Sequence, residues 1–166
     1  GCTMAVTAEN LAKQYQLTRE EIDAHAYSSH ERARANRDKL REEIVPVEVK
    51  TKKGTILLEE DQHVRETSME QLAKLPARFI EGGVVTPGNA SGMVDGAAAV
   101  IVTTLDYAKK HNLRPLAKLV SYEVVGVDPK IMGIGPVPAI QGALKKANLT
   151  VEDLDLVEIN EAFSAQ

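Results

Sequence analysis

The sequence predicts an α/β protein, and two observations carry that prediction. Residues 97–102, Ala-Ala-Ala-Val-Ile-Val, form an uninterrupted apolar run that is typical of a buried central strand. Further along, a strand is expected over 116–127, a helix from Pro138, and a second strand over 154–159. The order strand, helix, strand is the signature of α/β architecture.

Composition limits the class of protein and its partners. The chain has 166 residues, 43% hydrophobic and 27% charged, which suits one globular domain or parts of two. Aromatic residues make up 4% with no Trp, so we expect an aliphatic core. A net charge of −4 and the lack of a basic run argue against a nucleic-acid partner. No apolar stretch approaches the roughly 20 residues of a membrane span.

The first half of the sequence carries clear start and stop signals. Thr18 and Glu21 form a capping box, which begins a long charged helix. Pro46 indicates an edge strand, because proline has no amide hydrogen for a central ladder. The expected elements are, in order, a helix over 4–14, a helix from the capping box to about Leu40, a hairpin of 44–49 and 55–58, and a short helix over 69–75.

The second half alternates loops with regular elements. Residues 84–92 form a loop rich in Gly, Asn and Ser, which can bring bare backbone close to a ligand. The expected elements that follow are the strand over 97–102, a helix over 104–111 ended by Asn112, a boundary at Pro115, the strand over 116–127, a loop over 132–136, a helix from Pro138 ended by Asn148, and the strand over 154–159.

Asn160 comes directly after the last expected strand. In open α/β sheets, ligands bind just beyond the carboxyl ends of strands. An uncharged amide there can hold a water or an oxyanion by hydrogen bonds. The alternative is that Asn160 caps a helix that opens at Ala162. Spacing alone favours the cap over the ligand-binding role.

Several sequence blocks together resemble the thiolase family. They are Asn160-Glu161-Ala162-Phe163, residues 87–92 (Pro-Gly-Asn-Ala-Ser-Gly) and 95–98 (Asp-Gly-Ala-Ala), supported by matches at 7–10 and 127–139. The resemblance implies a thiolase fold of five α-β-α-β-α layers, held here in part. It implies a loop domain over 1–93 that covers coenzyme A, the end of an N-terminal domain over 94–115 and the start of a C-terminal domain over 116–166. We therefore expect an internal fragment of a longer protein.

The resemblance also implies an acyltransferase activity. Thiolases exchange an acyl group between a catalytic cysteine and coenzyme A, and the degradative members cleave 3-ketoacyl-CoA to release acetyl-CoA in fatty-acid β-oxidation. The family's nucleophilic cysteine lies upstream of the matched part, and its histidine and second cysteine lie downstream, so this chain alone is expected to be inactive. Cys2, the single cysteine, lacks the family's cysteine motif and a designated base. The four histidines, His25, His30, His63 and His111, show no metal-ligand spacing and are expected at the surface.

The site residues follow from the same resemblance. Asn160 matches the asparagine that holds a water facing the thioester or keto oxygen. The implied contacts to coenzyme A are Met4, Arg65, Thr67, Phe79, Ser91, Met132, Ala162 and Phe163. Taken in isolation, Ser91 would more often stabilise its own loop, and Phe79 and Met132 would more often be core. Arg65 would as often be a free surface arginine as a ligand contact. Thr3 and Ala5 depart from the residues that many relatives have beside the match at Met4, which corresponds to a residue near the acyl pocket, so the preferred acyl chain length stays open. Pro87 replaces an Ala that is frequent beside the pantetheine, a change that other relatives tolerate.

Two rivals to the degradative activity remain. One is a biosynthetic acetoacetyl-CoA thiolase, which shares every block, and the other is a thiolase-like carrier that binds acyl-CoA or lipid without turnover. Coenzyme A is expected as a substrate and not as a permanently bound cofactor, and no metal is expected. The resemblance favours the mitochondrial matrix, with the cytoplasm or peroxisome as alternatives, and a homodimer or homotetramer as the assembly.

Overall fold

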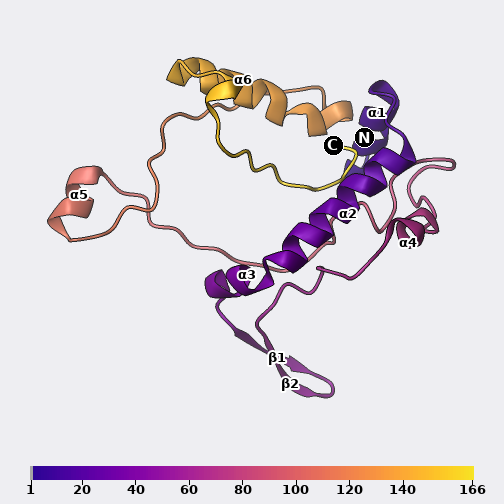
Figure 1. Cartoon of the computed structure of the whole chain (residues 1–166), viewed down its shortest axis with the longest axis horizontal. Helices are drawn as coiled ribbons and strands as arrows, with labels where there is room; N and C mark the ends of the chain where they lie inside the picture. Colours follow the sequence, from indigo (N-terminus) through magenta and orange to yellow (C-terminus); the bar gives the residue numbers. More distant parts are fainter. Residues whose placement is uncertain (1) are drawn as a thin grey trace. The chain divides into compact units, whose positions relative to one another are not determined.

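The computed structural model (Figure 1) describes residues 2–166. The chain divides into two units. The first unit runs up to residue 92 and also includes 129–132 and 161–166. The second unit consists of 93–128 and 133–160. Both units are therefore discontinuous in sequence, and residues 161–166 belong with the first half of the chain.

Two helices begin the first unit as predicted. α1 spans Met4–Gln14 and α2 spans Arg19–Ala35. The predicted capping box is confirmed: the Thr18 hydroxyl accepts from the Glu21 amide at 3.2 Å, and Glu21 Oε2 accepts from the Thr18 amide at 2.8 Å. The side chains of Thr18 and Glu21 each accept from a backbone amide that has no partner within the first turn of the helix.

The prediction of one continuous helix to about Leu40 is wrong. α2 ends at Asn36, whose backbone leaves the helical region at φ −115° and ψ 19°, and a separate helix, α3, spans Arg37–Glu43. The Asn36 side chain donates to the carbonyl of Arg32 at 2.9 Å. Asparagine competes with helical backbone bonds in this way, which explains a break at this residue.

The hairpin and the short helix that follow it were also predicted. β1 (Val47–Thr51) pairs antiparallel with β2 (Gly54–Leu58), with Val47 opposite Leu58. Gly54 has φ +121°, a conformation that favours glycine, at the end of the turn. α4 spans Met69–Ala73, and the Ser68 hydroxyl caps it by accepting from the Gln71 amide at 3.3 Å.

The core of the first unit is aliphatic, as the composition predicted. α1 contributes three alanines, α2 contributes Ile22, the 84–90 loop contributes Val85, and the end of the chain contributes Ala165. Phe163, Val84 and Ala90 pack against this cluster while partly exposed. The loop and the chain end are thus joined to the two helices by burial of apolar surface.

The second unit contains two helices, one complete 3-10 segment and the last two residues of another. α5 spans Leu105–Lys110, and α6 spans Pro136–Ala147. α6 begins two residues before the predicted start, and Asn148, with φ +55°, caps its carboxyl end as predicted. The 3-10 segments are η1 (Pro129–Ile134), which also includes residues of the first unit, and η2 (Val151–Asp153). Residues 121–123 lie against α6, because Ser121 donates to the Ala143 carbonyl at 2.8 Å and Lys146 pairs with Glu123 at 3.0 Å.

The three strands predicted over 97–102, 116–127 and 154–159 are wrong for this structure. These segments are irregular, and most of their apolar side chains are exposed, with Leu116 at 97% and Leu156 at 92%. A strand exists only where a neighbouring backbone completes its hydrogen bonds, and within residues 2–166 the sole paired strands are β1 and β2. Among residues 2–166, every helix is too short or too polar to span a lipid bilayer.

Candidate functional site

The loop of residues 84–91 is fastened to α1 by a buried carboxylate. Glu9 is 7% exposed, and its Oε1 accepts from the amides of Val84 at 3.0 Å and Val85 at 2.9 Å. A Cβ on Gly83 would clash with the same oxygen. The carboxylate therefore satisfies two backbone amides at a place where only glycine leaves it room.

A second buried carboxylate fastens the same loop to α2. Asp23 accepts from the Asn89 amide nitrogen at 2.8 Å through Oδ1 and from Arg19 Nε at 2.7 Å through Oδ2. Asp23 is 1% exposed and Asn89 is 3% exposed. Within the loop, Asn89 Oδ1 accepts from the Thr86 amide at 2.8 Å. The loop that contains Ser91 is thus defined by buried polar bonds from two helices.

Backbone pairing brings three predicted site residues together. The Ser91 amide donates to the Ala162 carbonyl at 2.9 Å, and the Ser164 amide donates to the Asn89 carbonyl at 2.9 Å, with Ala90 and Phe163 as an antiparallel bridge. Ser91 is exposed, while Ala162 and Phe163 are partly exposed. The expected contacts Ser91, Ala162 and Phe163 therefore lie on one short ladder.

One face of α2 binds the residue that follows Asn160. Glu161 accepts from the Ser29 hydroxyl at 2.5 Å and pairs with His25 Nε2 at 2.8 Å. Partial burial acts to raise the pKa of Glu161, but the hydrogen bonds from Ser29 and His25, with the charges of His25 and Arg32, outweigh it and lower that pKa below its usual value. The start of 161–166 is consequently held to α2 as a carboxylate.

Arg65 lies on a segment that contacts both α2 and the Ser91 loop. Its backbone amide donates to His30 Nδ1 at 3.3 Å. Burial and the charge of Arg65 lower the pKa of His30, against the opposing charges of Glu161 and a second carboxylate on α2. Two residues before Arg65, the ring of His63 lies so near Gly92 that a Cβ there would clash with its Cε1.

The other predicted contacts are mostly exposed. Met4 is 53% exposed, Phe79 47% and Met132 40%, so none of the three is a core residue in this structure, and Thr67 is partly exposed. The segment of Met132 is tied to α1, because the Asn10 side chain donates to the Lys130 carbonyl at 2.8 Å.

Asn160 is exposed and belongs to the second unit. Residues 161–166 contain no helix, so the alternative that Asn160 caps a helix opening at Ala162 is wrong.

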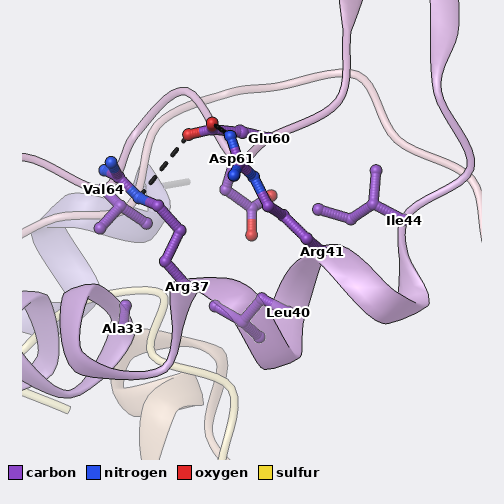
Figure 2. A pocket seen from close by; sticks show the side chains of 8 residues that line it. All are labelled: Ala33, Arg37, Leu40, Arg41, Ile44, Glu60, Asp61 and Val64. Atoms are coloured by element: carbon purple, nitrogen blue, oxygen red, sulfur yellow. Dashed lines mark ion pairs between the residues drawn. The ribbon is translucent and has the colours of Figure 1, made fainter.

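A small cavity lies elsewhere in the first unit, between α3 and residues 60–64 (Figure 2). Arg37 and Arg41 both pair with Glu60 over it, the first at 3.6 Å, and Leu40 and Ile44 lie beneath. Its volume of about 10 Å³ has room for little more than one water molecule. No predicted site residue lines it, and it is too small for a substrate.

Sequence reasoning missed the side chains that hold the site in place. Glu9 and Asp23 were not singled out, and His25 and His63 were treated only as surface residues, although both are indeed exposed. A usable signal existed for Asp23: it lies next to Ile22 on the narrow buried stripe of α2, four residues after Arg19. The described residues contain no group of three or more His, Cys, Asp or Glu side chains placed to hold a metal ion.

Comparison with known proteins defines the family. Residues 1–106 match the family described as thiolase, N-terminal domain, and residues 113–166 match thiolase, C-terminal domain. The chain therefore belongs to the thiolase family.

Individual relatives agree with this assignment. The chain is 55% identical over 166 residues to 3-ketoacyl-CoA thiolase, mitochondrial, of Homo sapiens, which covers 98% of this chain and 42% of that protein. It is 49% identical over 168 residues to the acetyl-CoA acetyltransferase of Syntrophomonas wolfei, which covers 100% of this chain and 42% of that protein. The chain thus spans about two fifths of the length of these curated relatives.

Solved structures agree on the fold. A crystal structure of human mitochondrial 3-ketoacyl-CoA thiolase matches with a TM-score of 0.91 at 55% identity, over 98% of this chain and 42% of that one. A crystal structure of the human protein in complex with CoA matches with a TM-score of 0.89 at 53% identity, over 98% and 41%. The expected thiolase fold is confirmed as a partial one.

Proposed function

We propose that the protein carrying this chain is a 3-ketoacyl-CoA thiolase that transfers an acyl group to coenzyme A and releases acetyl-CoA. The observation that carries the proposal is the ladder that joins Ser91 to Ala162 and Phe163. It places the exposed Ser91 beside Ala162 and Phe163, which follow Asn160 closely in sequence and which we expect to line the channel for coenzyme A. Identity of 55% to the human mitochondrial enzyme over this whole region supports the same choice.

The reaction has two steps, and each requires reactive groups on the protein. A thiolate attacks the β-keto carbon, the bond between the α- and β-carbons breaks, and its electron pair goes to the α-carbon, which takes a proton to become the methyl of acetyl-CoA. The acyl group then moves from that thiol to the sulfur of a second coenzyme A, whose proton goes to a base. The attacking thiol and the base are not among the residues that we assign in this chain.

This chain would supply binding and oxyanion support. In our proposal, the Asn160 amide holds a water that donates to the developing negative charge on the keto or thioester oxygen. Ser91 hydrogen-bonds the pantetheine arm, while Phe79, Met132, Met4, Ala162 and Phe163 line its channel. Arg65, with Thr67 beside it, meets the nucleotide end, since a guanidinium suits both phosphate pairing and stacking. Coenzyme A is a substrate here and leaves with each turnover.

The test is an assay of thiolysis. Incubation of the protein carrying this chain with 3-ketoacyl-CoA and coenzyme A should give acetyl-CoA and an acyl-CoA two carbons shorter, in equal amounts by liquid chromatography. Binding of acyl-CoA without any product would instead indicate the non-catalytic carrier. The absence of both acyl-CoA binding and product would refute the proposal.

A second candidate is acetyl-CoA acetyltransferase, favoured by the 49% identity to the Syntrophomonas wolfei protein. The two activities differ in chain length, so kcat/KM should be compared for a long-chain 3-ketoacyl-CoA and for acetoacetyl-CoA. A preference for the longer substrate supports the degradative enzyme. Activity confined to the four-carbon substrate would favour the acetyltransferase.

We also propose that the protein acts in the mitochondrial matrix and assembles as a homodimer or homotetramer. Relatives named as mitochondrial support the first point. Exposed apolar side chains on the hairpin, including Val47 at 56% and Leu57 at 54%, support the second. Cell fractionation and analytical ultracentrifugation test these two points separately, and a cytosolic, monomeric protein would contradict both.

A further inference from the structure

The starting observation is the buried carboxylate of Asp23, which α2 places under the Ser91 loop. At 1% exposure, a carboxylate is costly to bury unless each oxygen has a strong partner. Oδ2 accepts from Arg19 Nε at 2.7 Å, and the same guanidinium donates through Nη2 to the carbonyls of Leu72 at 2.6 Å and Leu75 at 2.9 Å. Arg19 is therefore held from two sides, which leaves Oδ1 of Asp23 directed at the loop.

The orientation of the Asn89 amide depends on this oxygen. Its nitrogen donates to Asp23 Oδ1 at 2.8 Å and to the Val84 carbonyl at 2.9 Å, and its oxygen accepts from the Thr86 amide at 2.8 Å. A flipped amide would set its NH2 group against the Thr86 N–H and its oxygen against two acceptors. The acceptor at position 23 thus stabilises this orientation of Asn89 together with the Val84 carbonyl and the Thr86 amide, and it is the only charged partner among the three.

From Asn89 the connection to the proposed coenzyme A contacts is short. The Asn89 carbonyl accepts from the Ser164 amide, and the Ser91 amide donates to the Ala162 carbonyl, both at 2.9 Å. Ser91 lies two residues after the side chain that Asp23 holds. The carboxylate is therefore one hydrogen bond away from the ladder that sets Ser91, Ala162 and Phe163.

We infer that Asp23 is a positioning residue that holds the Ser91 loop and its ladder in the geometry needed to bind the pantetheine arm of coenzyme A. Asp23 touches no substrate in this proposal and acts through Asn89. The functional half of the inference rests on the proposed thiolase activity. The structural half, that the Asp23 carboxylate orders this loop, stands on the described contacts.

The main variant is Asp23→Asn, which keeps the side chain's shape. Its new NH2 group must face either Arg19 Nε or the Asn89 nitrogen, and both are donors. Hydrogen–deuterium exchange of peptides covering 86–92 and 161–166 should become about tenfold faster, as expected when a charge-assisted bond is lost. KM for coenzyme A should rise about tenfold while kcat changes less than about threefold, the pattern of lost binding without lost chemistry.

Two further variants separate positioning from general stability. Leu11→Val removes a methylene from a buried residue of α1 that lies outside both the polar network and the apolar cluster under the loop, so it should lower the melting temperature but leave exchange of both peptides and KM unchanged. Arg19→Gln combined with Asp23→Asn removes the conflict between donors, because a glutamine at position 19 can accept where Arg19 donated. This pair should return KM to within about threefold of the original value although the melting temperature stays low.

The outcomes are decisive. Unchanged exchange in Asp23→Asn overturns the inference, and so does a faster exchange with unchanged KM. A double variant as impaired in KM as Asp23→Asn also overturns it, and this variant serves if the single one does not fold. If the parent protein shows no thiolysis, the proposed function fails, and the exchange measurements alone then decide whether Asp23 orders the loop.

Discussion

Residues 160 and 161 are neighbours, and both are exposed. The carboxylate of Glu161 is nevertheless anchored to α2 by hydrogen bonds from Ser29 and His25. Anchoring of the Glu161 carboxylate holds the backbone in place, while the neighbouring Asn160 side-chain amide stays free to meet water or ligand. The proposed roles at this scale can be tested one side chain at a time.

Asn160→Ala should lower kcat of the thiolase reaction by about 10²-fold, because it removes one oxyanion support. The Kd for coenzyme A, measured by calorimetry, should change much less. Gln141→Ala, which removes an exposed amide from α6, is the matched control and should leave both unchanged. An unaltered kcat in Asn160→Ala would remove this residue from the reaction.

Arg65→Ala should raise KM for coenzyme A about tenfold, the effect of losing one charged hydrogen bond near the nucleotide. Initial rates at varied coenzyme A concentration measure it. Arg114→Ala removes the same charge from an exposed position and should have no effect. Equal KM in the two variants would return Arg65 to the status of a surface arginine.

At this scale, family motifs were informative and local pattern was not. Ser91, Ala162 and Phe163 were selected by resemblance, and the structure brings them onto one ladder. Asp23 escaped notice because an acid on a charged helix resembles a solvated residue. Asp23 is buried because the loop containing Asn89 folds over it. The two residues are more than sixty positions apart, so the local sequence around Asp23 gives no sign of this contact.

Among the elements, the contact between α2 and the 61–67 segment should respond to pH. His30 accepts from the Arg65 amide through Nδ1, and its pKa lies below 6.5. A depressed histidine pKa means that the unfolded chain takes up the proton first, so the stabilisation is present above about pH 6.5 and is lost as pH falls through the folded pKa. Protonation of Nδ1 also removes the acceptor.

Urea denaturation midpoints measured between about pH 7.5 and pH 5.5 should therefore fall toward acid. His30→Gln offers a non-titrating acceptor and should flatten this part of the profile. An identical slope in the variant would show that other groups cause the loss.

Helices and the hairpin were predictable because their signals are local. Capping at Thr18 and Ser68, the turn at Gly54 and the stop at Asn148 all act within a few residues. The segments 97–102, 116–127 and 154–159 have strand composition, yet a strand depends on partners far away in sequence. Composition could indicate that these segments suit a sheet, but it could not supply the neighbouring backbone.

For the whole chain, the exposed apolar segments predict self-association. Val100, Ile101 and Val102 are each at least 85% exposed, as is Leu116. Apolar surface of this extent is unfavourable in water. The 166-residue chain expressed by itself should bind the dye ANS and sediment as a mixture of species. A single monodisperse monomer without ANS fluorescence would contradict this prediction.

The ladder between residues 89–91 and 162–164 also has a consequence for biosynthesis. The first unit recruits its closing segment from the far side of residues 93–160, so this unit stays incomplete while the ribosome is still translating that stretch. Until then, the underside of the 84–90 loop, with Val85 at its centre, has no Ala165 to cover it. We expect nascent chains halted before residue 161 to be held by chaperones, and release to follow once residues 161–166 emerge from the exit tunnel.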